Sequence, residues 1–252
     1  MFNPFVRVKP ERVKLRALTS TPRLAEVLPV IKLSKALPNW WRNLPSTFDV
    51  PPPPDPRMPP HPQKQMSAKH CYAMQEVFKN GLGIPLWADH LVCVTPEGRA
   101  HAHAPGKGMP GDQHPPQQFA GMLSPSSVHF KFHSPWWLIA DRPMHFWMCH
   151  PFYHQRDPFR FQTMPGAVEY HNQHSTNVNV ILPRPAKTTE IEFAAGEMIA
   201  YLMPMEDVRI DLVVEEVTEA EIDRVNFTKF ITARPLLFNR MRRKHKGQET
   251  AS

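Results

Sequence analysis

The chain of 252 residues suits one large domain, or one domain with ordered extensions. It combines 30 prolines with only 10 glycines, and its 6 tryptophans and 15 phenylalanines exclude general disorder. No apolar run approaches the roughly 20 residues of a membrane span, the first residues lack the apolar segment of a signal peptide, and the cysteines are too widely spaced for a disulfide framework. We therefore expect no membrane partner and synthesis in a reducing cytoplasm.

Charge is unevenly distributed along the chain, which has a formal net charge of +7. Residues 1–46 and the tail around Arg240–Lys246 are basic, whereas the stretch from Glu190 to Asp223 is strongly acidic. Basic termini are typical of proteins that contact nucleic acid. Alternatively, the basic termini dock on acidic surfaces of the same or a neighbouring subunit. The absence of base-reading or stacking motifs favours this second interpretation.

The N-terminal quarter of the chain is predicted to lie outside the core domain. Residues 1–49 are expected to form an extended basic arm, with one short helix near Leu24–Ile31. Residues 50–66 are expected to form a proline-rich spacer, because proline fixes φ and removes a hydrogen-bond donor from the backbone.

Residues 67–217 are predicted to form a β-rich core domain that contains one helix. The helix spans His70–Asn80, where apolar residues recur at helical spacing and Asn80-Gly81 supplies a stop. Thr95–Gly98 is typical of a hairpin turn. Short apolar or alternating runs predict strands at Ile84–Trp87, Leu91–Val94, Arg99–His103, Val128–His133, His145–His150, Val178–Leu182, Thr189–Phe193 and Met198–Met203. Strands at this spacing predict a mainly β fold, either a β-sandwich or barrel or a β-clip-like arrangement.

Residues 218–252 are predicted to form a C-terminal helix and a basic tail. Thr218 and Glu221 have the spacing of a capping box, which begins a helix. Arg234-Pro235 ends this helix, and a second short basic helix is expected over residues 236–245.

Several segments resemble a family of tailed-bacteriophage proteins that has no assigned activity. They are SKALPNWWRNLP at Ser34–Pro45, AMQEVFKNGLGIPLWADH at Ala73–His90, FHSPWW at Phe132–Trp137, and the stretch from Met164 to Ala200. The resemblance covers roughly residues 30–206. It implies a virion or host-cytoplasmic location and other phage structural proteins as partners.

Residues 164–203 are also similar in motif order to trimeric dUTPases. Pro165–Glu169 and Gly196–Leu202 match two of their motifs, and Glu169 stands at the place of the aspartate that binds sugar and positions water. Tyr170-His171-Asn172 departs from the family pattern, and the phosphate-binding loops are missing. The similarity therefore implies a β-clip-like fold, with a degenerate nucleotide binder as one alternative function.

Histidine is the residue type that most invites a metal site. His101 and His103 are one residue apart on a predicted strand and so share a face. Such pairs ligate iron or zinc in β-barrel metalloproteins. The candidates for further ligands are Asp112, His114, His171 and His174. The alternative is a polar strand edge with solvated histidines, and no cofactor other than a possible metal is expected.

Two tryptophan doublets, Trp40-Trp41 and Trp136-Trp137, are predicted to serve an interface, with one ring of each pair inward and one outward. The chain lacks a nucleophile elbow, a P-loop and a dinucleotide fingerprint. These features favour a non-enzymatic phage protein, a virion structural or accessory component of the head, neck or tail that forms homo-oligomers. The metal-binding and nucleotide-binding alternatives remain open.

Overall fold

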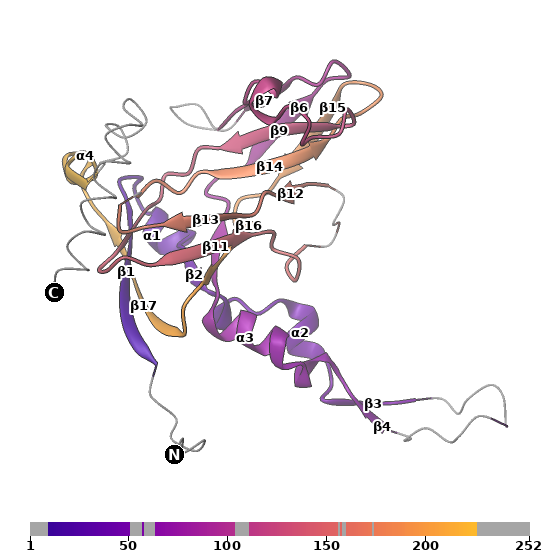
Figure 1. Cartoon of the computed structure of the whole chain (residues 1–252), viewed down its shortest axis with the longest axis vertical. Coiled ribbons are helices and arrows are strands. Elements are labelled where there is room, and N and C mark those ends of the chain that lie inside the picture. Colours follow the sequence, from indigo (N-terminus) through magenta and orange to yellow (C-terminus); the bar gives the residue numbers. More distant parts are fainter. Residues whose placement is uncertain are drawn as a thin grey trace.

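The computed structural model of the chain describes residues 10–50, 57, 64–103, 111–155, 157, 160–172 and 174–225. Its described strands form five hydrogen-bonded sheets, with few helices, so the prediction of a mainly β fold is confirmed (Figure 1). The predicted second helix over 236–245, the basic tail and most of the proline-rich spacer lie outside the described residues.

A three-stranded sheet joins the beginning and the end of the described chain. Its strands, in spatial order, are β10 (Trp137–Ala140), β1 (Glu11–Thr19) and β17 (Val208–Glu216). β1 runs parallel to β17 along its full length and antiparallel to β10. An ion pair of 2.7 Å between Arg16 Nε and Glu215 Oε2 links β1 to β17.

The expectation of an extended arm therefore does not hold for Glu11–Thr19. Val13, Leu15 and Ala17 alternate with charged residues and are completely buried in the main core. Alternation of this kind is the pattern of a half-buried strand, because successive side chains point to opposite faces. The short helix predicted near Leu24–Ile31 is present as α1 (Leu24–Val27).

The largest sheet has five strands and positions much of the surface discussed below. In spatial order they are β13 (Gly166–Glu169), β11 (His145–Cys149), β16 (Met198–Pro204), β5 (Leu82–Pro85) and β2 (Ile31–Lys32). Neighbouring strands in this sheet run antiparallel. The strands predicted around His145, Met198 and Ile84 thus become neighbours.

Two further sheets lie above the five-stranded sheet in the view of Figure 1. One contains β12 (Gln162–Thr163), β14 (Val178–Pro183), β9 (Ser127–Phe132) and β8 (Gly111–Asp112). The other contains β15 (Thr189–Phe193), β6 (His90–Val94) and β7 (Ala100–His103). The predicted hairpin turn is confirmed, since the Gly98 amide donates to the Thr95 carbonyl at 2.9 Å and Gly98 has a φ of 79°.

The remaining pair of strands forms a hairpin that projects away from the body. β3 (Thr47–Asp49) pairs with β4 (Lys64–Met66), and all six residues are exposed. Figure 1 shows this hairpin extending beyond the helices at one corner of the molecule. The β3–β4 hairpin therefore gains little support from the rest of the described chain.

Helices are short and few. The helices near the five-stranded sheet are η1 (Leu33–Lys35), α2 (Asn39–Asn43), η2 (Ala68–His70) and α3 (Tyr72–Asn80), and elsewhere lie η3 (Pro116–Phe119) and α4 (Glu219–Val225). The predicted capping box is confirmed, because the Glu221 amide donates to Thr218 Oγ1 at 3.2 Å and the Thr218 amide to Glu221 Oε2 at 3.0 Å. No helix in the described part of the chain has the length and apolar character needed to cross a membrane.

Buried side chains form two clusters. The main core takes residues from all four larger sheets and includes Phe130, Trp136, Phe146 and Tyr170. A smaller cluster joins β16 to the helices and contains Leu33, Trp41, Phe78, Met198 and Tyr201. The five-stranded sheet is therefore buried on one face by the main core, and on the other face in part by a helical layer formed by η1, α2 and α3.

Candidate functional site

The uncovered part of the five-stranded sheet carries an exposed tryptophan. Along β11, Phe146 and Met148 are buried in the main core, whereas His145 and Trp147 point outward. The Trp147 side chain is 42% exposed. An exposed aromatic ring is unfavourable in water, because its apolar surface stays in contact with solvent. Covering the ring with a partner would remove that surface from water.

The neighbours of Trp147 on the adjacent strands are also apolar. Trp147 lies opposite Met203 on β16 and opposite Ala167 on β13. Met203 is half-buried and Ala167 is exposed. Trp147, Ala167 and Met203 together form a strip across three strands, which we call the Trp147 surface.

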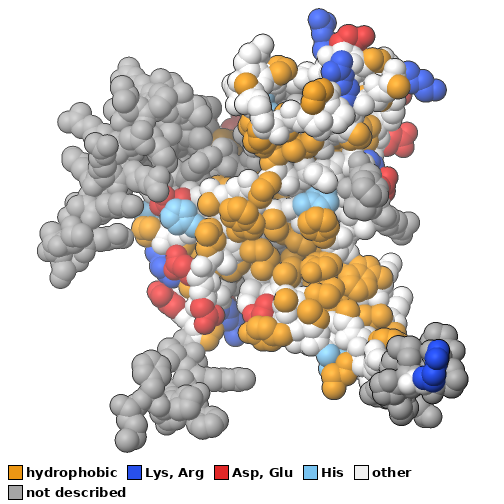
Figure 2. Space-filling view, turned by 45° about the vertical axis from the view of Figure 1, so that its right-hand side comes forward, with side chains coloured by type: hydrophobic (Ala, Val, Ile, Leu, Met, Phe, Trp, Pro, Cys, Tyr) orange, Lys and Arg blue, Asp and Glu red, His pale blue; other side chains and the backbone are white. Residues whose placement is uncertain are grey.

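Exposed apolar residues also lie beyond the two ends of β11. Phe152 follows the strand, and Met205 is held beside its beginning by a 3.0 Å hydrogen bond from the Met205 amide to the His145 carbonyl. Figure 2 shows hydrophobic side chains gathered over the middle and lower part of one face of the body, with most charged groups near its edges. An apolar centre with a polar rim is typical of protein interfaces.

The β3–β4 hairpin presents a second set of exposed apolar side chains. Phe48 is 45% exposed and Met66 is 71% exposed. Tyr72, at the beginning of α3, is also exposed. A two-stranded hairpin is only marginally stable in water by itself, so this projection is suited to contact with another chain.

The first tryptophan doublet lies on α2 rather than on a strand. Trp41 is 8% exposed and packs into the smaller cluster, whereas Trp40 is 43% exposed. The Trp40 Nε1 donates to the Tyr153 carbonyl at 2.7 Å. The predicted division into one inward and one outward ring therefore holds, and Trp40 stays available to an interface.

The second doublet is largely internal. Trp136 is completely buried in the main core, and Trp137, the first residue of β10, is half-buried. Trp136 therefore stabilises the fold and, in this conformation, cannot contact a partner. The outward aromatic residue that the sequence reasoning missed is Trp147, whose signal was the alternation of His145–Cys149.

The two candidate metal ligands meet as predicted. His101 and His103 are exposed on β7, and their ring centroids lie 5.2 Å apart. Within the described residues, however, no group of three or more histidine, cysteine or acidic side chains has the arrangement of a metal site.

The further ligands suggested by sequence have other partners. The Asp112 carboxylate lies 3.1 Å from Lys131 Nζ and 3.3 Å from His133 Nε2. His114 bonds Gln118, and His174 bonds the Val225 carbonyl. The structure thus brings together the pair but not a complete ligand set.

Glu169 is placed at the end of β13 and is half-buried. Its Oε1 accepts a hydrogen bond of 2.6 Å from Asn172 Nδ2. The adjacent Tyr170 is completely buried and packs against Phe146, with ring centroids 5.6 Å apart. Glu169 therefore holds a local turn through Asn172.

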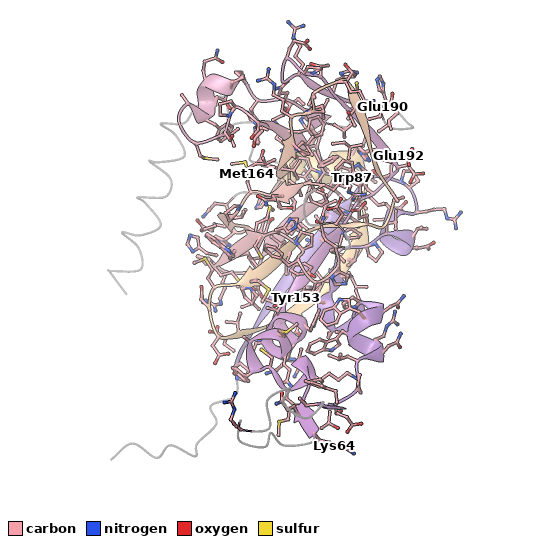
Figure 3. The ribbon with its side chains drawn as sticks, turned by 90° about the vertical axis from the view of Figure 1, so that its right-hand side faces the viewer. Lys64, Trp87, Tyr153, Met164, Glu190 and Glu192 are labelled. Carbon is pink, nitrogen blue, oxygen red and sulfur yellow. The ribbon has the colours of Figure 1, made fainter. Side chains whose placement is uncertain are left out.

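A half-open cavity of about 410 Å³ lies beside β6 and β15. It is lined by Asp89, His90, Leu91, His103, Glu192, Phe193 and Ala194. Burial lowers the pKa of His90, whose Nδ1 lies 2.8 Å from the Ala88 carbonyl. Figure 3 shows Glu190 and Glu192 together toward one end of the molecule, with Trp87 nearby, whereas Tyr153 and Lys64 lie toward the other end. The lining is acidic and separate from the Trp147 surface.

His129 is one of four buried histidines in the described part of the chain. The alternation of β9 predicts His129 on the face opposite Phe130, yet both side chains are buried. The His129 ring packs against Phe119 of η3 and against His114, with centroid distances of 4.4 and 4.8 Å. Burial, and then the charge of His114, lower the pKa of His129 from 6.5 to about 4.

Comparison of the chain with models of protein families, with curated protein sequences and with solved structures gives no match.

Proposed function

We propose that the protein is a non-enzymatic bacteriophage protein, a structural or accessory component of the virion. It acts through protein–protein interfaces and assembles first with copies of itself. The Trp147 surface carries this proposal, because its apolar strip lies on a sheet that the chain's own helical layer covers only in part. The resemblance to a phage family supplies the context.

The β3–β4 hairpin favours a second copy of the chain as the occupant of the Trp147 surface. The β3–β4 hairpin projects from the body and carries apolar side chains that the same chain leaves exposed. A molecule that has both an open apolar strip and a projecting apolar element can supply both halves of a repeated contact. Assembly would then remove both features from water, and the same contacts would join copies in a particle.

The test is the mass of the purified full chain by light scattering, alone and after mixing with purified particles. We expect a discrete oligomer that joins the particle fraction. Trp147→Gln should lower the oligomer mass and leave the thermal midpoint unchanged at concentrations where both proteins are monomers. Met122→Gln is the control, because Met122 is similarly exposed but lies in a different part of the chain. A monomer that joins no particle would contradict the proposal.

A further inference from the structure

A basic cavity of about 500 Å³ lies where β2, η1, the end of α3 and the beginning of β17 meet. Lys32, Lys35, Lys79 and Arg209 line it. Among the described residues of the lining, Asp207 alone is acidic. Three segments far apart in the sequence thus place cationic side chains around one hollow.

Among the described residues, three of these four cations have no carboxylate partner. Lys79 Nζ lies 3.0 Å from Glu76 Oε1, and Asn80 Nδ2 donates to Glu76 Oε2 at 2.6 Å. Glu76 therefore fixes both side chains at the edge of the cavity and offsets the charge of Lys79. Within the described part of the chain, no ion pair joins Lys32, Lys35 or Arg209 to an acidic side chain.

Uncompensated like charges around a hollow repel one another and attract anions. The walls of a cleft have a low dielectric constant and concentrate the field of its charges, so the effect is larger than on an open surface. The volume lies within the range of sites for small molecules. The cationic side chains of the lining favour an anionic ligand over an apolar one.

We propose that this basic cavity binds a phosphate-bearing anion. Lysine ammonium groups bind phosphate as point charges, and a guanidinium can bond two phosphate oxygens at once. Lys32 and Lys35 supply the first kind of contact, Arg209 the second, and the Ser34 hydroxyl can donate a further hydrogen bond. The phosphate group belongs either to a free small molecule or to a nucleic-acid backbone, and this proposal does not depend on the Trp147 surface.

The test uses the full chain and titration calorimetry with two probes, inorganic pyrophosphate and a short DNA duplex. Lys32→Gln/Lys35→Gln removes two charges from the cavity. The matched control, Lys14→Gln/Lys187→Gln, removes two charges from exposed positions outside it. We expect the cavity variant to weaken binding by about tenfold or more and the control to leave it nearly unchanged. Thermal midpoints check that both variants fold.

The two probes distinguish the sources of the phosphate. If the natural chain binds pyrophosphate and the cavity variant does not, the ligand is a free phosphate compound. Binding of the duplex alone, lost in the same variant and weakened by salt, supports a nucleic-acid backbone. The proposal is overturned if neither probe binds at millimolar concentration, or if the two variants lose affinity equally.

Discussion

Trp41 on α2 packs against Phe78 on α3, with ring centroids 4.7 Å apart and a tilt of 52° between the ring planes. Tyr153, which follows β11, lies 5.4 Å from Phe78 by the same measure. These three rings hold the helical layer on the five-stranded sheet. Cys149 of β11 packs against this layer, whereas Trp147, two residues earlier on the same strand, is 42% exposed.

Trp41→Ala is expected to destabilise the protein by about 3–5 kcal/mol, because it leaves a cavity in the smaller cluster. Trp40→Ala removes a neighbouring ring that is 43% exposed and one hydrogen bond, so its cost should be about 1 kcal/mol. Urea unfolding followed by circular dichroism measures both. Equal losses from the two substitutions would show that α2 does not anchor the layer through Trp41.

Stability is expected to decrease as the pH falls from about 6.5 to about 4, in part through His129. Its pKa in the folded state is about 4, whereas the unfolded chain has the ordinary value of 6.5. In this window the unfolded state binds the proton more readily, so acid favours unfolding. The contribution of His129 is at most roughly 3 kcal/mol.

The pH profile of His129→Phe provides the comparison. Burial also lowers the pKa of His90, His150 and His154, which contribute in the same direction and are present in both proteins. The variant should therefore lose less stability than the natural chain between neutral pH and pH 4. Parallel profiles would contradict the assignment to His129.

Gly83 permits a close approach within the five-stranded sheet. A Cβ added at Gly83 would lie 2.5 Å from Met198 Sδ and 2.7 Å from Met198 Cε. Gly83→Ala is expected to cost about 1–3 kcal/mol, because the smaller cluster is overpacked. Gly166→Ala is the control on the same sheet, since no atom lies within 4 Å of its added Cβ. Chemical denaturation should separate the two, and similar midpoints would show that Met198 moves aside freely.

Local patterns predicted most of the strands of the core domain. Val128–His133, Thr189–Phe193 and Met198–Met203 alternate or form short apolar runs, and each became a strand within one or two residues of the expected ends. β1 and β17 were missed for an electrostatic reason. The outward residues of β1 are basic, and those of β17 include Asp211 and Glu215, so each segment looked like a solvated region until pairing matched Arg16 with Glu215.

The candidate sites depend on contacts between distant segments. The spacing of His101 and His103 was sufficient to predict a shared face, because strand geometry is local. Spacing could not identify the further ligands, and one candidate, Asp112, instead pairs with Lys131 of β9 and with His133, which follows that strand. In the same way, the sequence of β11 does not reveal that the helical layer stops short of Trp147.

The β3–β4 hairpin should contribute to assembly but not to the stability of the isolated chain. Phe48→Ser/Met66→Ser removes side chains that are 45% and 71% exposed and lie outside both buried clusters, so the free energy of unfolding of the monomer should change by less than about 0.5 kcal/mol. The oligomer mass measured by light scattering should fall, because the hairpin loses the side chains that would pack on a neighbouring copy. Val27→Ser is the matched control, as Val27 is 60% exposed on α1, away from the hairpin. If the hairpin variant keeps the full oligomer mass, the contact between copies lies elsewhere, and the Trp147 surface must be filled by another part of the neighbouring chain.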